Sequence, residues 1–121
     1  MKNYSNIKPT LTREIDETAT FTKCSDLVGK FEEGVLTIHG YFKNKSKKYN
    51  KDQYSLYVIR HIKNKEVHLL LNVPGWYGAK LEQDFLASGQ TAEEFFEGNS
   101  IAEIESFETK FGTDSYNIII W

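Results

Sequence analysis

The stretch "EVHLLLNVPGWYGAKLEQDFLAS" (residues 66–88) contains the point at which the chain changes from strand to helix. Its first eight residues are apolar enough to form a central strand. Pro74 and Gly75 end that strand. Leu81, Phe85 and Leu86 then recur at helical spacing, and Gly89 supplies a stop signal. We therefore predict a strand over residues 66–73, followed by a helix over residues 79–87.

Strand patterns surround this stretch on both sides. "VLTIHGYF" (residues 35–42) alternates between two faces, and "QYSLYVIRHI" (residues 53–62) is rich in β-branched and aromatic residues. Thr91 and Glu94 have the spacing of a capping box, which predicts a second short helical turn. "SIAEIESFETK" (residues 100–110) and "SYNIIIW" (residues 115–121) then predict two more strands.

The predicted order is three strands, a helix and two strands, in an all-β fold with one helix. This is the layout of the five-stranded OB-fold barrel, whereas other small barrels usually lack the inserted helix. The length of 121 residues fits a single domain. Residues 1–18 are polar and carry Pro9, so we expect an N-terminal arm followed by one OB-fold domain over residues 19–121.

Composition favours a cytoplasmic protein. Cys24 is the single cysteine, so no intramolecular disulfide can form, which fits a reducing compartment. "MKNYSNIKPTLTREIDETAT" has no apolar run and does not read as a signal peptide. The longest apolar runs, "HLLLNV" and "NIIIW", are too short to span a bilayer, so no membrane association is expected.

Charge is distributed unevenly along the chain. Residues 41–65 carry eight Lys and Arg residues against one acid, a net charge of +7. Residues 82–114 carry nine acids against Lys110, a net charge of −8. This pattern predicts a basic functional face on an acidic body, unless folding brings the two segments together and they neutralise each other.

The basic segment centres on "YFKNKSKKYNKDQYSLY" (residues 41–57), which connects the first two predicted strands. OB-folds bind oligonucleotides through this loop and through the loop between the last two strands, here "ETKFGTD". Both loops place a lysine beside an aromatic residue, at Lys48–Tyr49 and at Lys110–Phe111. Lysines attract phosphates, and aromatic faces stack on unpaired bases of any identity. The predicted nucleic-acid-binding residues are Tyr41, Lys43, Lys45, Lys47, Lys48, Tyr49, Lys51, Tyr57, Arg60, Lys110 and Phe111.

The same residues admit structural roles. A lysine-rich loop can simply be solvated, and Tyr54 can be part of the core because it shares a face with Leu56 and Val58. Tyr57 lies on the other face, where it can also meet a partner subunit. Trp76 and Tyr77 fit a plug between barrel and helix better than a stacking site. Packing or a dimer contact suits Trp121 better than DNA does.

Enzyme functions receive little support from the sequence. His39, His61 and His68 lie on predicted strands at spacings that match no metal signature. Neither a nucleophile motif nor a phosphate-binding glycine loop is present. We expect a non-enzymatic protein without metal or cofactor, although acids that converge on a metal cannot be recognised from sequence alone.

From about Thr20 to Trp121 the chain resembles the small single-stranded-DNA-binding proteins of phages that infect Gram-positive bacteria, in particular the lactococcal phage type. The resemblance rests on "FTKCSDLVGK", "GYFKNKSKKYNKDQYSLYV", "VPGWYG" and "FETKFGTDSYNIII". It implies an OB-fold, a role in phage DNA replication or recombination in the host cytoplasm, and homo-oligomers. The binding features of the family would fall on Lys43, Lys45, Lys47, Lys48, Tyr49, Tyr57, Lys110 and Phe111.

One departure concerns the end of the chain. Bacterial proteins of this function commonly end in an acidic tail that recruits replication partners, whereas this chain ends in the apolar "NIIIW". Recruitment of recombinase or replication proteins through such a tail is therefore in doubt. We expect at least a dimer, formed through residues 35–42 or the last strand, because exposed strand edges tend to be paired or covered.

The sequence thus predicts sequence-tolerant binding of single-stranded DNA, in which the protein coats and protects the strand. The rival hypothesis is a small-barrel protein-interaction module, such as a phage-encoded inhibitor of a host factor. That module would use the same basic face against an acidic protein surface.

Overall fold

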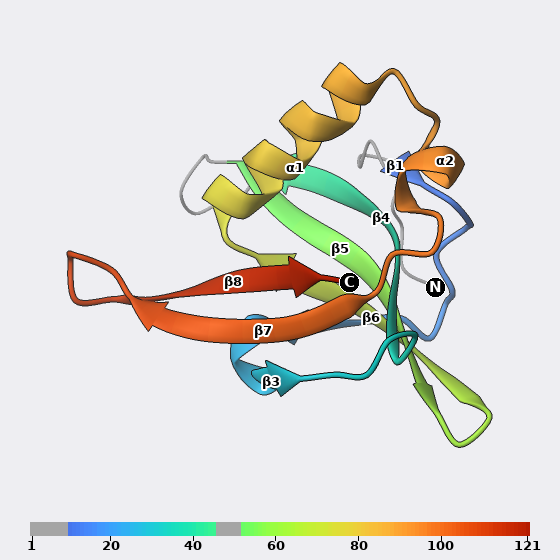
Figure 1. The fold of residues 1–121 in the computed structure, drawn as a ribbon, viewed down its shortest axis with the longest axis horizontal. Coiled ribbons are helices and arrows are strands. Elements are labelled where there is room, and N and C mark those ends of the chain that lie inside the picture. The colour runs from blue at the N-terminus through green and yellow to red at the C-terminus, as the bar shows by residue number, and fades with distance from the viewer. Residues whose placement is uncertain (1–9, 46–51) are drawn as a thin grey trace.

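The computed structural model describes residues 10–45 and 52–121. Its strands form two sheets (Figure 1). The five-stranded sheet has the order β1-β4-β5-β6-β2, and the three-stranded sheet has the order β3-β7-β8. The first sheet is made of β1 (Thr10–Leu11), β4 (Leu36–Lys45), β5 (Asp52–Ile62), β6 (Lys65–Val73) and β2 (Thr20–Lys23). The second is made of β3 (Gly29–Lys30), β7 (Ile101–Glu108) and β8 (Asp114–Ile120).

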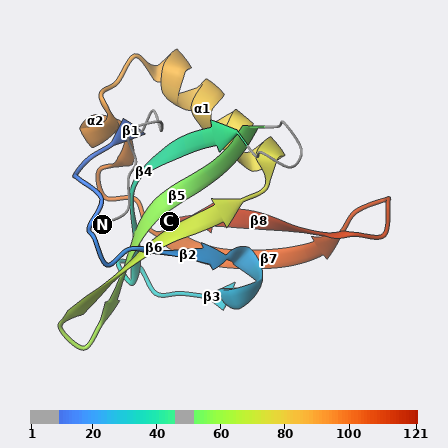
Figure 2. The same ribbon diagram turned by 180° about the vertical axis from the view of Figure 1, so that it is seen from behind.

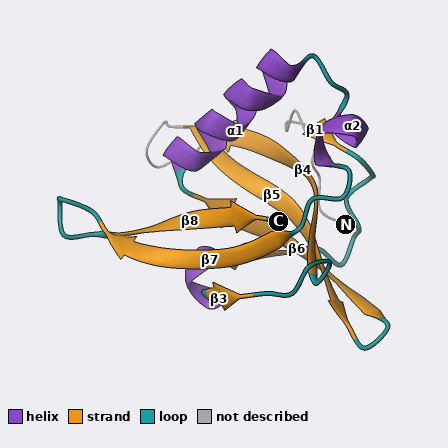
Figure 3. Ribbon diagram, viewed as in Figure 1, coloured by secondary structure: helices purple, strands orange, loops and turns teal. Residues whose placement is uncertain are grey.

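Helices cover one face of the larger sheet (Figure 3). Helix α1 (Gly75–Ser88) begins directly after Pro74 and ends at Gly89, whose φ of 68° is the left-handed cap that glycine adopts easily. Helix α2 (Ala92–Phe96) begins with the predicted capping box, in which Thr91 and Glu94 satisfy each other's backbone N–H groups. A 3-10 turn, η1 (Cys24–Asp26), follows β2. Both predicted helices are present with the predicted Gly89 stop and capping box, but α1 begins at Gly75, four residues before the predicted start.

Strands β4, β5 and β6 form an antiparallel meander. A two-residue turn joins β5 to β6, and both of its residues have positive φ, 44° at Lys63 and 67° at Asn64. Two consecutive residues of this conformation make a turn whose twist matches that of the strands beside it. The hairpin is therefore tight, with Ile62 opposite Lys65.

Strand β5 is buried on both of its faces, because residues 54–59 are all buried. Tyr54, Leu56 and Val58 belong to the main core, which lies between the sheet, the helices and the smaller sheet. Tyr57 and Ile59 point to the opposite face and belong to a second core. The segment that leads from β1 to β2 covers this second core with Leu11, Ile15 and Ala19 (Figure 2).

The covering segment starts from β1, which pairs antiparallel with β4 at an irregularity in that strand. Gly40 lies at this irregularity with a φ of 137°. A Cβ atom at this position would overlap the backbone of Thr10 and Leu11. Glycine is required here because the two backbones approach closely.

The prediction of a predominantly β fold is confirmed, but the strand order differs from the predicted one and the sheets do not close into the predicted OB-fold barrel. All five expected strands and the helix are present, as β4, β5, β6, α1, β7 and β8. Three further strands, β1, β2 and β3, add to the sheets at positions that the sequence did not indicate. The sheets stay separate instead of closing, since β2 pairs parallel with β6 and occupies that edge.

Candidate nucleic-acid interface

One of the two predicted loops, the turn between β7 and β8, lies on the side of the molecule to which the ends of β4 and β5 point (Figure 1), whereas residues 46–51 of the other loop lie outside the described part of the chain. The ends of β4 and β5 that flank residues 46–51 and the turn between β7 and β8 both point to this side (Figure 1, Figure 2). The first turn of α1 lies between them. The arrangement brings together segments that are about sixty residues apart in the chain.

Lys43 is held in an ion pair close to the first loop. Its Nζ atom donates to Glu82 Oε1 at 3.0 Å. Tyr54 also donates to Glu82 Oε1, at 3.2 Å, and Tyr41 donates to Oε2 at 3.3 Å. The hydrogen bond to Glu82 raises the pKa of the Lys43 ammonium, and burial raises the pKa of both phenols. The Lys43 ammonium and the hydroxyl groups of Tyr41 and Tyr54 therefore keep their protons at neutral pH.

The turn between β7 and β8 projects an aromatic side chain into solvent. Thr109 N–H donates to Thr113 O at 2.8 Å, and Gly112 has a φ of 78°, so the turn is closed and tight. Phe111 at its tip is 80% exposed. Lys110 Nζ lies 5.2 Å from the centre of the Phe111 ring. The predicted pairing of a cation with an open aromatic face is present here.

Trp76 and Phe107 form a second exposed aromatic site beside this turn. The Trp76 ring is 50% exposed and its centre lies 6.3 Å from that of Phe107, which is 42% exposed. Trp76 Nε1 donates to Ser115 Oγ at 3.1 Å, which fixes the indole against the hairpin. Sequence reasoning favoured packing for Trp76 and did not consider Phe107. The order Phe107–Lys110–Phe111 around a predicted turn was the signal that could have identified the hairpin as aromatic.

Several predicted site residues lie elsewhere. Tyr41 is 4% exposed and Tyr57 is fully buried, so neither ring presents an open face on which a base could stack in this structure. Arg60 lies at the opposite end of β5, where its guanidinium is 6.0 Å from the centre of the Phe31 ring. The side chain of Lys45 and the residues Lys47, Lys48, Tyr49 and Lys51 lie outside the described part of the chain.

The predicted basic face is divided. Lys43 lies near one end of the β4–β5 hairpin, whereas Lys63 and Lys65 lie at the β5–β6 turn, on the opposite side of the molecule (Figure 1). The Lys43–Glu82 ion pair joins the basic segment of the chain to the acidic one. This contact agrees with the alternative that folding brings the two segments together and partly neutralises them. Lys43 and Lys110 are the lysines of the predicted site whose side chains the structure describes.

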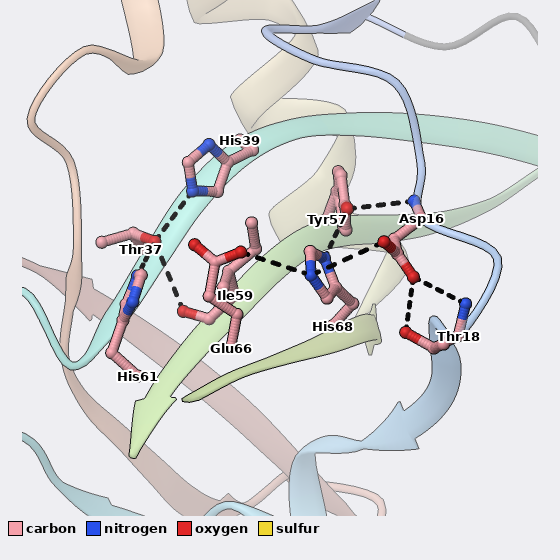
Figure 4. Close-up of polar contacts among 9 residues, drawn as sticks. All are labelled: Asp16, Thr18, Thr37, His39, Tyr57, Ile59, His61, Glu66 and His68. Atoms are coloured by element: carbon pink, nitrogen blue, oxygen red, sulfur yellow. Dashed lines mark hydrogen bonds and ion pairs between the residues drawn. The ribbon is translucent and has the colours of Figure 1, made fainter. Parts of the chain in front are cut away.

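The three histidines of the chain all lie on the outer face of the larger sheet, in two separate groups of polar contacts (Figure 4). Thr37 Oγ1 lies 2.8 Å from His39 Nε2 and 3.0 Å from His61 Nε2. Tyr57 Oη lies 2.7 Å from His68 Nδ1, and His68 Nε2 faces Asp16 and Glu66. Within residues 10–45 and 52–121, no three His, Cys, Asp or Glu side chains are arranged to hold a metal. These polar contacts link β4 to β5, and they link β5 and β6 to the N-terminal segment that contains Asp16.

Cys24 is buried and donates its Sγ–H to Asn72 O at 3.1 Å. Burial raises the pKa of the thiol to about 11, so the nucleophilic thiolate is scarce at neutral pH. Among the described helices, none has the length and apolar character to cross a membrane.

No family model matches the chain, and comparisons with curated proteins and with solved structures give no match.

Proposed function

We propose that the protein binds single-stranded DNA with little sequence preference, through the side of the molecule formed by the β7–β8 hairpin, the start of α1 and the loop between β4 and β5. The observation that carries the proposal is the set of exposed rings at Trp76, Phe107 and Phe111, with the Lys110 ammonium beside Phe111. In this proposal, the protein coats unpaired strands during replication or recombination of phage DNA.

The chemistry of this side suits an unpaired strand. Each base that stacks on an aromatic ring contributes about 1–3 kcal/mol, and every base offers such a face. Duplex DNA keeps these faces covered by its own stacking. Lys110 lies beside Phe111, so a phosphate can be bound next to a stacked base.

We infer that the fold is a variant of the OB-fold in which the sheets do not close into a barrel. Strands β4, β5 and β6, helix α1 and strands β7 and β8 follow one another along the chain as the strands and helix of an OB-fold do, although β1, β2 and β3 precede them. A bridge between Thr37 and Ser100, and the bond from Ile38 N–H to Asn99 O at 3.0 Å, join the first of these strands to the start of the fourth. In OB-folds, the loops that correspond in chain order to residues 46–51 and to the β7–β8 turn are the loops that bind oligonucleotides.

The test is a titration of labelled oligo-dT, long enough to cover the roughly 4–16 nucleotides of an OB-fold site. We expect saturable binding at low salt, weaker binding at high salt, and a clear preference over duplex of the same length. Trp76→Ala and Phe111→Ala should each weaken binding about tenfold, in line with the loss of one stacked base.

Trp121→Ala is the matched control, because Trp121 is 57% exposed but lies at the other end of β8 from the hairpin turn. It should leave the affinity unchanged. No binding at low salt, equal affinity for duplex, or equal losses in all three variants would exclude the proposed interface.

A second candidate is a protein-interaction module, and one observation favours it. A groove of about 490 Å³ is lined by Phe31, Ile119 and Trp121, with Glu32 and Glu103 at its margin. Replication or recombination proteins are the partners to try. Quenching of Trp76 fluorescence by oligo-dT, lost in Trp76→Phe, is expected of the DNA-binding protein alone.

A further inference from the structure

Three hydrogen-bond donors converge on a single carboxylate at the edge of the proposed interface. Glu82 Oε1 accepts from Lys43 Nζ at 3.0 Å and from Tyr54 Oη at 3.2 Å, and Oε2 accepts from Tyr41 Oη at 3.3 Å. The side chain of Glu82 is 21% exposed and that of Lys43 is 38% exposed. The cluster is thus open to solvent at the lysine and closed at the two phenols.

The fold holds the donors in place without help from Glu82. Lys43 and Tyr54 are opposite each other in the pairing of β4 with β5. Lys43 Nζ lies 5.9 Å from the centre of the Tyr54 ring. Tyr41 is two residues before Lys43, so both side chains point to the same face of β4. Tyr41 and Tyr54 are buried in the main core, which keeps their hydroxyl groups in position.

Helix α1 delivers the carboxylate to these donors. Gly78 packs directly on the Tyr54 ring, with no room for a Cβ atom. Glu82 follows four residues later, on the same face of the helix. The carboxylate is therefore attached to a separate element by a flexible side chain, and it can leave the donors without unfolding the strands.

A phosphodiester resembles this carboxylate because its single negative charge is shared by two non-bridging oxygens. We propose that Lys43, Tyr41 and Tyr54 form a phosphate-binding site for the nucleic-acid backbone, and that Glu82 occupies this site until a strand displaces it. The inference rests on the proposed function, because the ligand is the backbone of the bound strand. It gives Glu82 the role of a built-in competitor.

The displacement is energetically reasonable. A partly exposed ion pair contributes little net free energy, since each charge regains water when the pair separates. Lys43 would then exchange one anion for another, and the two phenols would keep an acceptor. The bound DNA strand gains one phosphate contact, and the protein loses the hydrogen bonds and the ion pair of Glu82.

The experiment compares Glu82→Gln with Asp84→Asn in oligo-dT titrations at several salt concentrations. Glutamine keeps the shape of Glu82 but leaves Lys43 with an unneutralised charge. Asp84→Asn also removes one acid from α1 and frees one lysine, Lys80, but on the exposed surface of the helix. We expect Glu82→Gln to raise affinity about three- to tenfold over Asp84→Asn. The salt slope should steepen by about 0.7, as for one added contact to a single strand.

Lys43→Gln completes a double-mutant cycle, in which the gain from Glu82→Gln should disappear. If wild-type protein binds and the two acid variants behave alike, the inference is wrong and the proposed function stands. If wild-type protein fails to bind but Glu82→Gln binds, Glu82 closes the site more completely than we expect. If neither binds at low salt, both the function and the inference are overturned.

Discussion

Tyr57 is a buried tyrosine whose hydroxyl group joins two separate parts of the protein. The hydroxyl oxygen accepts the N–H of Asp16 at 3.1 Å, and it lies 2.7 Å from His68 Nδ1 (Figure 4). The hydroxyl therefore uses its oxygen as an acceptor for Asp16 while it is hydrogen-bonded to His68. This network fastens the N-terminal segment to β5 and β6.

Tyr57→Phe should therefore destabilise the fold without loss of the ring's packing. The variant leaves the Asp16 N–H and a nitrogen of buried His68 without their partner, which costs about 1–3 kcal/mol. Urea unfolding followed by circular dichroism measures the loss. Tyr116→Phe is the control, because no partner of the Tyr116 hydroxyl is found among the described residues. Equal stability of the two variants would contradict the role assigned to Tyr57.

The burial of Tyr57 could not be predicted from the local sequence pattern. The alternation of residues 53–62 indicates a strand, and a strand with one exposed face would present Tyr57 to solvent. Which face is covered depends on a segment far away in the chain, here Leu11, Ile15 and Ala19. Phe111 was predicted correctly as exposed because a tight turn determines its environment locally.

At the scale of elements, α1 depends on the absence of a side chain at Gly78. Gly78→Ala would place a Cβ atom on top of Cβ and Cγ of Tyr54, so either the helix or the tyrosine must move. We expect a loss of about 1–3 kcal/mol despite the better helix propensity of alanine. Gly75→Ala is the matched control, with no neighbouring atom in the way, and should change stability by less than about 1 kcal/mol. Thermal unfolding of the two variants gives the comparison.

The N-terminal segment should be held more weakly at mildly acidic pH. Thr12 Oγ1 lies 3.3 Å from His39 Nδ1. Burial lowers the pKa of His39, and Arg13, His61 and His68 lower it further against an opposing effect of Glu66. The unfolded chain therefore binds a proton at His39 before the folded protein does. Stability present above the ordinary histidine pKa is lost as pH falls through that value toward the lower folded pKa.

Urea unfolding between pH 7.5 and 5.5 tests this expectation, since carboxylates remain ionised over most of that window. The free energy of unfolding should fall as pH falls, and His39→Gln should reduce the slope. A slope that is unchanged in His39→Gln would assign the pH dependence to another group. Asp16 acts in a separate window, because its hydrogen bonds with Thr18 lower its pKa and their contribution is lost only in more acidic solution.

Elements with a strong local signal were predicted, and short ones were not. Strands β4 to β8 and helix α1 have seven or more residues each, which is long enough for a period to show. Strands β1 and β3 have two residues each and β2 has four, and "TFTK" alternates no more clearly than many loops. Their pairing is decided by tertiary contacts, as when β2 aligns parallel with β6. Because such pairings depend on tertiary contacts, the local sequence pattern could not show whether the two sheets join into a barrel.

At the scale of the whole molecule, strand edges limit how copies of the chain can meet. The predicted alternative over residues 35–42 is unsuitable, because most of this segment lies in β4, and β4 lies between β1 and β5. Strand β8 is an edge of the smaller sheet and is seven residues long. Ile119, on this strand, is 37% exposed. An edge of this length and character is commonly paired or covered.

We therefore expect a dimer formed through β8, with a mass of twice 14.0 kDa in light scattering at micromolar concentration. Ile119→Lys should yield the monomer mass, because a lysine on an edge strand opposes pairing with another chain. Val67→Lys is the control: Val67 is equally exposed, at 41%, but its strand lies between β5 and β2. If wild-type protein has the monomer mass, or if both variants dissociate alike, β8 is not the contact between copies. Because Ile119 is on the opposite end of β8 from the hairpin turn, the monomeric variant should still bind oligo-dT, with cooperativity between copies reduced.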